Sequence, residues 1–123
     1  MTQLLSPVVP LDALIVEDDI ASRKALLQIL SLQGLGASAV SNLAQARQAL
    51  AEMPRALILD LMLPDGNGIE ILREVRAARL PIRVAVLSGA DRPMIAEAEL
   101  LQPDAVFTKP VELTKLLQWL KAV

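Results

Sequence analysis

The chain contains no cysteine and no histidine. Without cysteine it can form neither disulfide bonds nor thiolate metal sites. Without histidine it has no imidazole base, no imidazole nucleophile and no phosphohistidine of its own. Any histidine chemistry in its function must therefore come from a partner.

Aromatic residues and net charge are also scarce. Phe107 and Trp119 make up the 2% of aromatic residues, and 12 Lys and Arg against 14 Asp and Glu leave a formal net charge of −2. Nucleic-acid binding uses basic surface and stacking rings, and anionic membranes attract basic patches. We therefore expect no direct nucleic-acid partner and no membrane partner.

Long hydrophobic runs are missing, although 54% of the residues are hydrophobic. Charges or prolines interrupt each apolar stretch before it reaches membrane-spanning length. Residues 1–3 lack the basic start and apolar run of a secretory signal, so we expect a cytoplasmic protein. At 123 residues we expect one domain over residues 11–123, preceded by an irregular lead-in over residues 1–10 that contains two prolines.

Short apolar runs alternate with amphipathic stretches along the chain. The runs do not alternate with polar residues, which is typical of strands buried on both faces of a parallel sheet. They cover residues 11–16, 37–40, 56–59, 84–87 and 105–107.

Between these runs, apolar residues recur at three- and four-residue spacing and predict helices. Leu26, Leu30 and Leu32 are among the residues expected on the apolar face of the first helix. Ser41 or Asn42 is a suitable N-cap for the second helix, and a proline at 93 suits the first turn of the fourth. The alternation predicts a doubly wound α/β fold, a five-stranded parallel sheet with helices on both faces.

Polar side chains follow the predicted strands at their carboxyl ends, where ligands bind in doubly wound sheets. Glu17 and Asp18 follow the first run, Asp60 the third, Ser88 the fourth and Lys109 the fifth. Converging carboxylates repel each other unless a cation lies between them, and Mg²⁺ prefers carboxylate and phosphate oxygens. Because Lys109 and Ser88 suit phosphoryl oxygens, Asp60 is the candidate nucleophile toward phosphorus.

Four segments of the sequence carry motifs: LIVEDD at 14–19, LDLMLPDGNG at 59–68, LSGA at 87–90 and FTKP at 107–110. Together they resemble the response-regulator receiver domains of two-component signalling. The resemblance covers residues 11–120, and the segments occur in the same order as in that family.

This resemblance implies a phosphorylated aspartate at Asp60 and a bound Mg²⁺. Asp18, Asp60 and the backbone carbonyl of Met62 would bind the ion directly, and Glu17 would act on it through water. Ser88 and Lys109 would contact the phosphoryl group.

The resemblance also implies a flavodoxin-like strand order, 2-1-3-4-5, and a cis bond between Lys109 and Pro110. The chain would be a phosphoryl acceptor that assists its own phosphorylation and dephosphorylation, rather than an enzyme for external substrates.

Several partners follow from the resemblance. The phosphoryl donor would be a sensor histidine kinase or a phosphotransfer protein. The output would be a downstream protein or a C-terminal effector domain, since the chain is either a stand-alone receiver or the first part of a longer regulator. The fourth helix, fifth strand and fifth helix would form the switching face and a homodimer contact.

Val106 and Val111 depart from the family pattern, and Val111 stands where the family often has an aromatic residue after the proline. Receiver domains usually carry Tyr or Phe at the place of Val106, and the neighbouring Phe107 should point to the opposite face of the sheet. Trp119 lies at the edge of the last apolar helix face, where it either packs in the core or anchors a partner.

The polar residues also allow other interpretations. A degenerate, non-phosphorylated binding module would keep the fold alone. A phosphatase of the haloacid dehalogenase type would need a second aspartate two residues after the nucleophile, where this chain has Met62. Asp19 is expected to be a helix N-cap, and residues 65–68 are expected to form a turn.

Overall fold

The computed structural model describes residues 11–89 and 92–122, and the predicted lead-in at 1–10 lies outside the described residues. All strands of the main sheet pair in parallel, in the order β2-β1-β3-β6-β7. Counting only these five strands along the chain, the order is 2-1-3-4-5, so the predicted fold is confirmed. The strands are β1 (Ala13–Val16), β2 (Ala37–Val40), β3 (Ala56–Asp60), β6 (Arg83–Ser88) and β7 (Ala105–Thr108).

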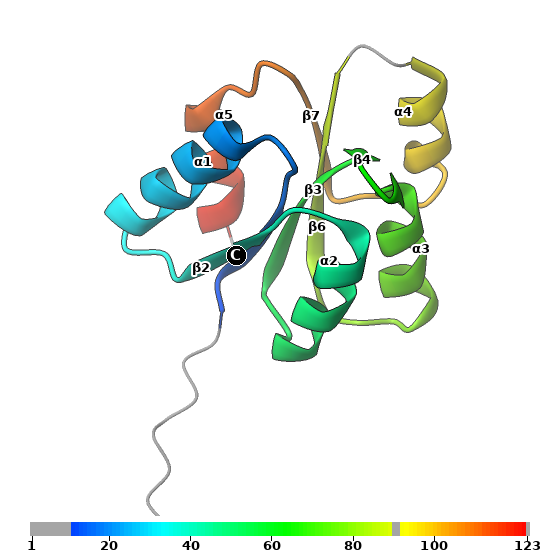
Figure 1. Cartoon of the computed structure of the whole chain (residues 1–123), viewed down its shortest axis with the longest axis horizontal. Helices are drawn as coiled ribbons and strands as arrows, with labels where there is room; N and C mark the ends of the chain where they lie inside the picture. The colour runs from blue at the N-terminus through cyan, green and yellow to red at the C-terminus, as the bar shows by residue number, and fades with distance from the viewer. Residues whose placement is uncertain (1–10, 90–91, 123) are drawn as a thin grey trace, which may run out of the picture.

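Helices cover both faces of this sheet. Figure 1 shows α1 and α5 on one face and α2, α3 and α4 on the other. A short 3-10 turn, Leu50–Glu52, continues α2. The helices are α1 (Ile20–Leu32), α2 (Leu43–Ala49), α3 (Ile69–Ala77), α4 (Arg92–Glu99) and α5 (Leu113–Lys121).

The core is divided by the sheet into two layers. In β1, Leu14 and Val16 join the cluster under α2, α3 and α4, whereas Ala13 and Ile15 join the cluster under α1 and α5. Successive strand residues point to opposite faces, so a strand covered on both sides must be apolar throughout. This explains why the strand sequences do not alternate with polar residues.

Two sequence predictions need correction. The first strand begins at Ala13, not at residue 11, and the Asp12 side chain before it accepts a hydrogen bond at Oδ2 from the Gly36 N–H at 2.7 Å. Leu32 is 76% exposed although we expected it on the apolar face of α1. The buried residues of α1 are Leu26 and Leu30, and a residue two positions after Leu30 points away from them.

The predicted helix starts are confirmed. Asp19 is the N-cap of α1, where its Oδ2 accepts from the Ser22 N–H at 2.8 Å. Asn42 is the N-cap of α2, where its Oδ1 accepts from the Gln45 N–H at 2.8 Å. Pro93 is the second residue of α4.

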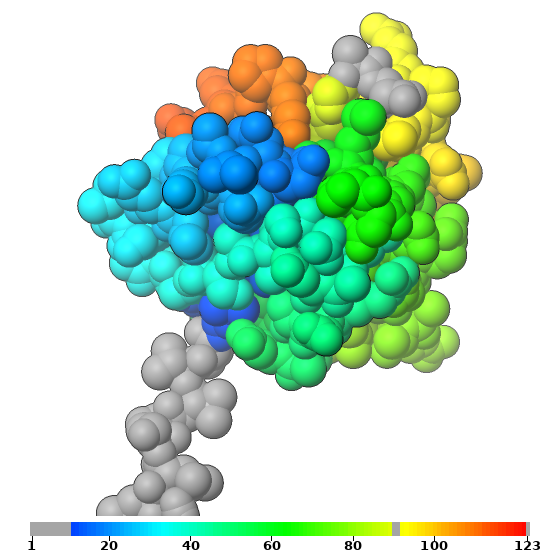
Figure 2. Space-filling model, in the orientation of Figure 1, coloured from blue at the N-terminus to red at the C-terminus, as the bar shows by residue number. Residues whose placement is uncertain are grey.

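The residues predicted as a turn, 65–68, overlap a small antiparallel hairpin, in which Asp65 lies in the turn and residues 66–67 form the second strand. Its strands are β4 (Met62–Leu63) and β5 (Gly66–Asn67). Figure 2 shows this hairpin (bright green) at the surface beside α2 (teal). No helix within residues 11–89 and 92–122 is long and apolar enough to cross a membrane.

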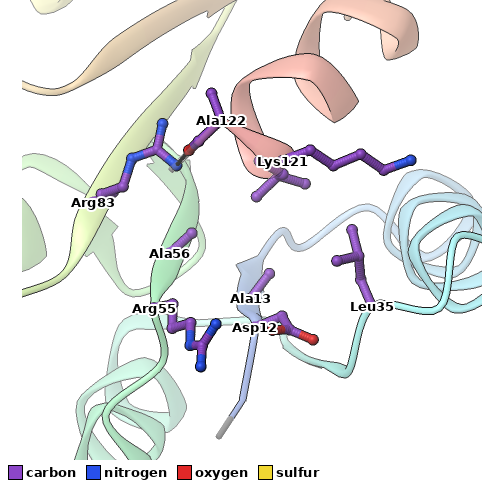
Figure 3. A pocket seen from close by; sticks show the side chains of 9 residues that line it. Asp12, Ala13, Leu35, Arg55, Ala56, Arg83, Lys121 and Ala122 are labelled. Carbon is purple, nitrogen blue, oxygen red and sulfur yellow. Dashed lines mark hydrogen bonds between the residues drawn. The ribbon is translucent and has the colours of Figure 1, made fainter.

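The amino-terminal edge of the sheet borders a cavity of about 360 Å³ (Figure 3). It lies between the starts of β1, β3 and β6 and the end of α5, where Arg83 donates to the Ala122 carbonyl at 2.7 Å. Arg55 and Lys121 also line it. This cavity lies at the opposite end of the strands from the predicted site.

Candidate functional site

The carboxyl ends of four strands bring the predicted site residues to one edge of the sheet. Glu17 follows β1, Asp60 ends β3, Ser88 ends β6 and Lys109 follows β7. Parallel pairing forces this convergence, since Val16 lies opposite Leu59 in the sheet register.

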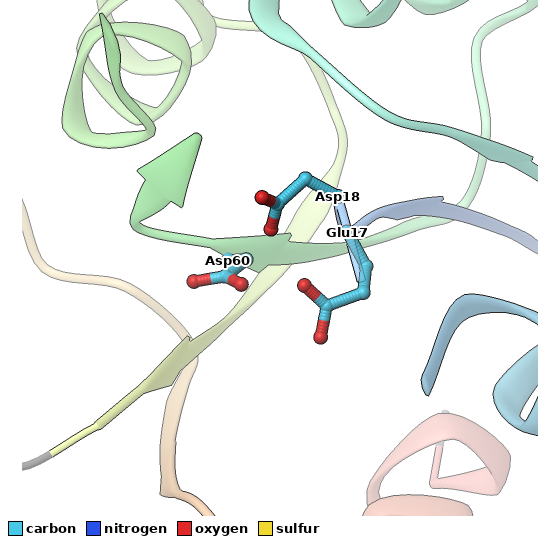
Figure 4. A group of neighbouring side chains, drawn as sticks. All are labelled: Glu17, Asp18 and Asp60. Carbon is cyan, nitrogen blue, oxygen red and sulfur yellow. The ribbon is translucent and has the colours of Figure 1, made fainter. Parts of the chain in front are cut away.

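Three carboxylates form the centre of the site. One carboxylate oxygen from each of Glu17, Asp18 and Asp60 lies within 4.8 Å of the others. Figure 4 shows the three side chains directed toward a common space. Glu17 and Asp60 are only 1% and 3% exposed, whereas Asp18 is exposed. Solvent therefore reaches this group of negative charges from the side of Asp18.

Lys109 supplies a positive charge to this group. Its Nζ lies 2.8 Å from Asp60 Oδ2 and 3.0 Å from Glu17 Oε1. Burial alone would lower the pKa of Lys109, but its hydrogen bonds to Asp60 and Glu17 outweigh that effect and raise the pKa. The ammonium group therefore stays charged. The predicted cis bond between Lys109 and Pro110 is present.

Glu17 carries an unsatisfied oxygen. Burial raises the pKa of Glu17 to about 7, and the neighbouring Asp60 adds to the rise, which Lys109 only partly offsets. Its Oε2 is buried and has no hydrogen-bond partner among the residues that the structure describes. A buried acceptor without a partner is costly.

These features fit a hard divalent cation. Three carboxylates face one ammonium group, so the local charge is negative, and the donor atoms are the oxygens that Mg²⁺ prefers. A cation would also give the open oxygen of Glu17 a partner, directly or through water.

The remaining site residues hold Asp60 or lie beside it. Met62 N–H donates to Asp60 Oδ1 at 3.0 Å, while the Met62 side chain is 63% exposed. Ser88 is buried, and its hydroxyl donates to the Gly89 carbonyl at 3.1 Å. The structure thus brings Glu17, Asp18, Asp60 and Lys109 together, and Ser88 makes its bond within its own loop.

A hollow of about 470 Å³ opens beside Lys109. Leu26 of α1, Leu87 of β6 and Val111 contribute apolar walls, and Ser22 contributes a hydroxyl. It provides access to the site from the side of α1.

The sequence model of the response regulator receiver domain family matches residues 13–121. The chain belongs to this family. The receiver domain is 32% identical over 111 residues to a CpxR homologue, a transcriptional regulatory protein of Haemophilus influenzae, covering 89% of this chain and 48% of that protein. It is 30% identical over 116 residues to the response regulator MprA of Mycolicibacterium vanbaalenii, covering 93% and 50%.

Solved receiver structures agree with this assignment. A response regulator receiver protein from Pseudomonas putida superimposes with a TM-score of 0.78 at 29% identity, covering 86% of this chain and 91% of that one. The receiver domain spans about half the length of the curated relatives it matches.

Sequence reasoning missed one contact of this receiver domain. Asp65 accepts hydrogen bonds from the backbone amides of Leu43 and Ala44 at 2.8 and 3.2 Å. Asp65 follows Leu43 by 22 positions and Ala44 by 21 positions in the chain, so no local sequence pattern could have revealed the contact. The sequence pattern around Asp65 predicts only a turn.

Proposed function

We propose that this receiver domain accepts a phosphoryl group on Asp60 in the presence of Mg²⁺ and thereby changes its protein contacts. One observation carries the proposal. The buried Asp60 carboxylate lies between the Lys109 ammonium at 2.8 Å, the Met62 amide at 3.0 Å and two further carboxylates. A buried carboxylate is costly unless it is paired and hydrogen-bonded, and the groups that pair with Asp60 are those that phosphoryl transfer to a carboxylate needs.

The proposed donor is a phosphohistidine on a sensor histidine kinase or a phosphotransfer protein, because the chain has no histidine of its own. An Asp60 oxygen attacks phosphorus and forms an acyl phosphate, while the P–N bond to the imidazole breaks and its electron pair stays on nitrogen. Bound Mg²⁺ would neutralise the carboxylates and the phosphoryl oxygens.

The residues of this chain then have separate tasks. Asp18, Asp60 and the Met62 carbonyl would hold Mg²⁺, and Glu17 would act through water. Lys109 already lies 2.8 Å from Asp60, so its ammonium can pair with a phosphoryl oxygen.

The buried Ser88 hydroxyl would exchange its bond to Gly89 for one to the new phosphoryl group. Phosphorylation adds roughly −1.5 to −2 charges and three acceptor oxygens, which is enough to shift the populations of two loop arrangements.

A phosphoryl acceptor agrees better with this site than a phosphatase does. Met62, which is 63% exposed, stands where a dehalogenase-type phosphatase has the aspartate that acts as acid and base. A binding module without phosphorylation is the second candidate, but it would give the open Glu17 oxygen and the paired Lys109 no role.

We propose that the output passes through the face built from α4, β7 and α5. Leu100, which follows α4, and Leu113, the first residue of α5, are 83% and 38% exposed. The partner would be a downstream protein, a C-terminal effector domain or a second copy, and the domain over 11–123 would act in the cytoplasm. The relatives are about twice as long and include a transcriptional regulatory protein, which supports an effector domain.

The test is phosphorylation by acetyl phosphate with Mg²⁺, followed by intact mass spectrometry. We expect one added phosphoryl group, which should be absent from the isosteric variant Asp60→Asn and from a chelated sample. If the folded wild-type protein takes up no phosphoryl group and binds no fluoroberyllate, the switch is wrong and the binding module is favoured.

A further inference from the structure

We infer that Asp65 is a positioning residue of the phosphorylation site, because it fastens the β4–β5 hairpin to α2 and so holds Met62 against Asp60. This inference rests on the function proposed above. Met62 is the part of the hairpin that reaches the site, through its N–H bond to Asp60 Oδ1 at 3.0 Å.

The contact between Asp65 and α2 is made by both carboxylate oxygens. Oδ1 accepts from Leu43 N–H at 2.8 Å and Oδ2 accepts from Ala44 N–H at 3.2 Å. These amides belong to the first helical turn, where negative charge is favoured. The Leu43 amide in particular keeps the pKa of Asp65 below its usual value.

Asp65 is not the only side chain that caps the start of α2. Asn42 already accepts from Gln45 N–H at 2.8 Å, as a normal N-cap does. Asp65 instead reaches the start of α2 from the hairpin, 22 residues along the chain. The bond therefore joins two elements, whereas the Asn42 bond stays within one.

The hairpin fits tightly between Asp60 and α2. Gly66 has a φ of +151°, and a Cβ there would lie 2.6 Å from Leu43 Cδ1 and 2.9 Å from Glu70 Oε2. A Cβ on Gly68 would overlap the backbone oxygen of Asp60. Both glycines thus allow the hairpin to pack closely against α2 and the backbone of Asp60.

The hairpin itself is too small to keep its shape alone. It pairs Met62 with Asn67 and Leu63 with Gly66, and isolated two-stranded hairpins are at best marginally stable. Asp65 lies in the turn between the two strands and binds α2 there. Without that bond, the hairpin keeps its packing contacts but loses the charged hydrogen bonds that hold its turn on α2.

The experiment compares Asp65→Ala with Asn42→Ala, which removes the other side-chain cap of the same helix. Asp65→Ala should slow phosphorylation by acetyl phosphate about ten-fold, because small displacements of positioning groups cost rate steeply. Asn42→Ala should change the rate less than about two-fold, since it leaves the hairpin bonds in place. Asp65→Asn, which keeps one acceptor, should recover part of the rate.

Hydrogen exchange of the Met62 amide, followed by NMR without Mg²⁺, gives a second readout that needs no phosphorylation. If the two variants have similar melting temperatures, exchange of the Met62 amide should be faster in Asp65→Ala than in Asn42→Ala. The inference would be overturned if Asp65→Ala kept the wild-type phosphorylation rate and the wild-type protection of the Met62 amide. It would also be overturned if Asn42→Ala slowed phosphorylation as much as Asp65→Ala does. If wild-type protein takes up no phosphoryl group, the proposed function fails, while the exchange comparison still decides the role of Asp65.

Discussion

Glu17 shows how one buried residue makes the stability of this domain depend on pH. Its pKa is raised from 4.5 to about 7, chiefly by burial, so the folded state keeps a proton on Glu17 over a range where the unfolded state has lost it. Between those two pKa values the folded state binds more protons, and its stability must fall as pH rises. The slope is at most about 1.4 kcal/mol per pH unit for a single group.

We therefore predict that, without divalent cations, the domain is less stable to urea at about pH 8 than at about pH 5. Glu17→Gln should reduce this difference in stability between the two pH values. Glu112→Gln, which changes an exposed carboxylate, should leave the difference unchanged. A Glu17→Gln variant with the wild-type slope would contradict the prediction.

For Met62 we predict an effect on a different property, the lifetime of the proposed acyl phosphate. Its exposed thioether offers no hydrogen bond to an attacking water, although its backbone touches Asp60. Met62→Asn should shorten the lifetime roughly two- to ten-fold by orienting that water.

The lifetime can be followed by intact mass after acetyl phosphate is removed. Met53→Asn is the control, because Met53 is also exposed but lies at the end of the turn after α2. An unchanged lifetime in Met62→Asn would show that water is oriented by another group.

At the scale of elements, the packing of α5 clarifies the role of Trp119. Its ring meets Phe107 edge-on, with 6.5 Å between centroids and an angle of 75°, and the Arg83 guanidinium lies 4.1 Å above it. Arg83 also donates to the Trp119 carbonyl at 2.9 Å. These contacts favour core packing over the alternative of a free partner anchor.

Trp119→Ala should accordingly lower the free energy of unfolding by about 2–3 kcal/mol, from lost burial and lost ring contacts. Urea unfolding followed by circular dichroism measures this change. Phosphorylation of Asp60 should persist under conditions where the variant is folded. A variant of wild-type stability with weakened self-association or partner binding would instead support the anchor.

The elements also show what the sequence could and could not predict. Strands such as 56–59 were located because burial on both faces requires continuous apolar residues. Leu32 was misplaced because spacing alone does not say where the apolar face of a helix ends. Val106 and Phe107 do pack in opposite layers, as strand geometry requires.

For the whole molecule, parallel pairing made the convergence of Asp60, Glu17 and Lys109 predictable from strand order. The Ser88 bond to Gly89 and the Asp65 bond to α2 were not predictable, since they depend on loop conformation and on long-range contact. The site therefore follows from topology, and its supporting contacts follow from tertiary packing.

The excess negative charge at the site predicts that Mg²⁺ stabilises the whole domain. A ligand present at 100 times its dissociation constant adds about 2.7 kcal/mol, if it binds only the folded state. The melting temperature should rise with MgCl₂ and fall back with a chelator. Asp18→Asn should weaken the response, because it removes one of the three clustered carboxylates. If the melting temperature of Asp18→Asn rose with MgCl₂ as much as that of the wild type, the ion would bind elsewhere.

Trp119 is the single tryptophan of the chain, and there is no tyrosine. Its emission therefore comes from one known place, between the Arg83 guanidinium and the Phe107 ring, on the helix that ends at Lys121. The domain carries a native optical probe of α5. A spectral change on adding fluoroberyllate at Asp60 would report, without any label, that the signal has reached the last helix.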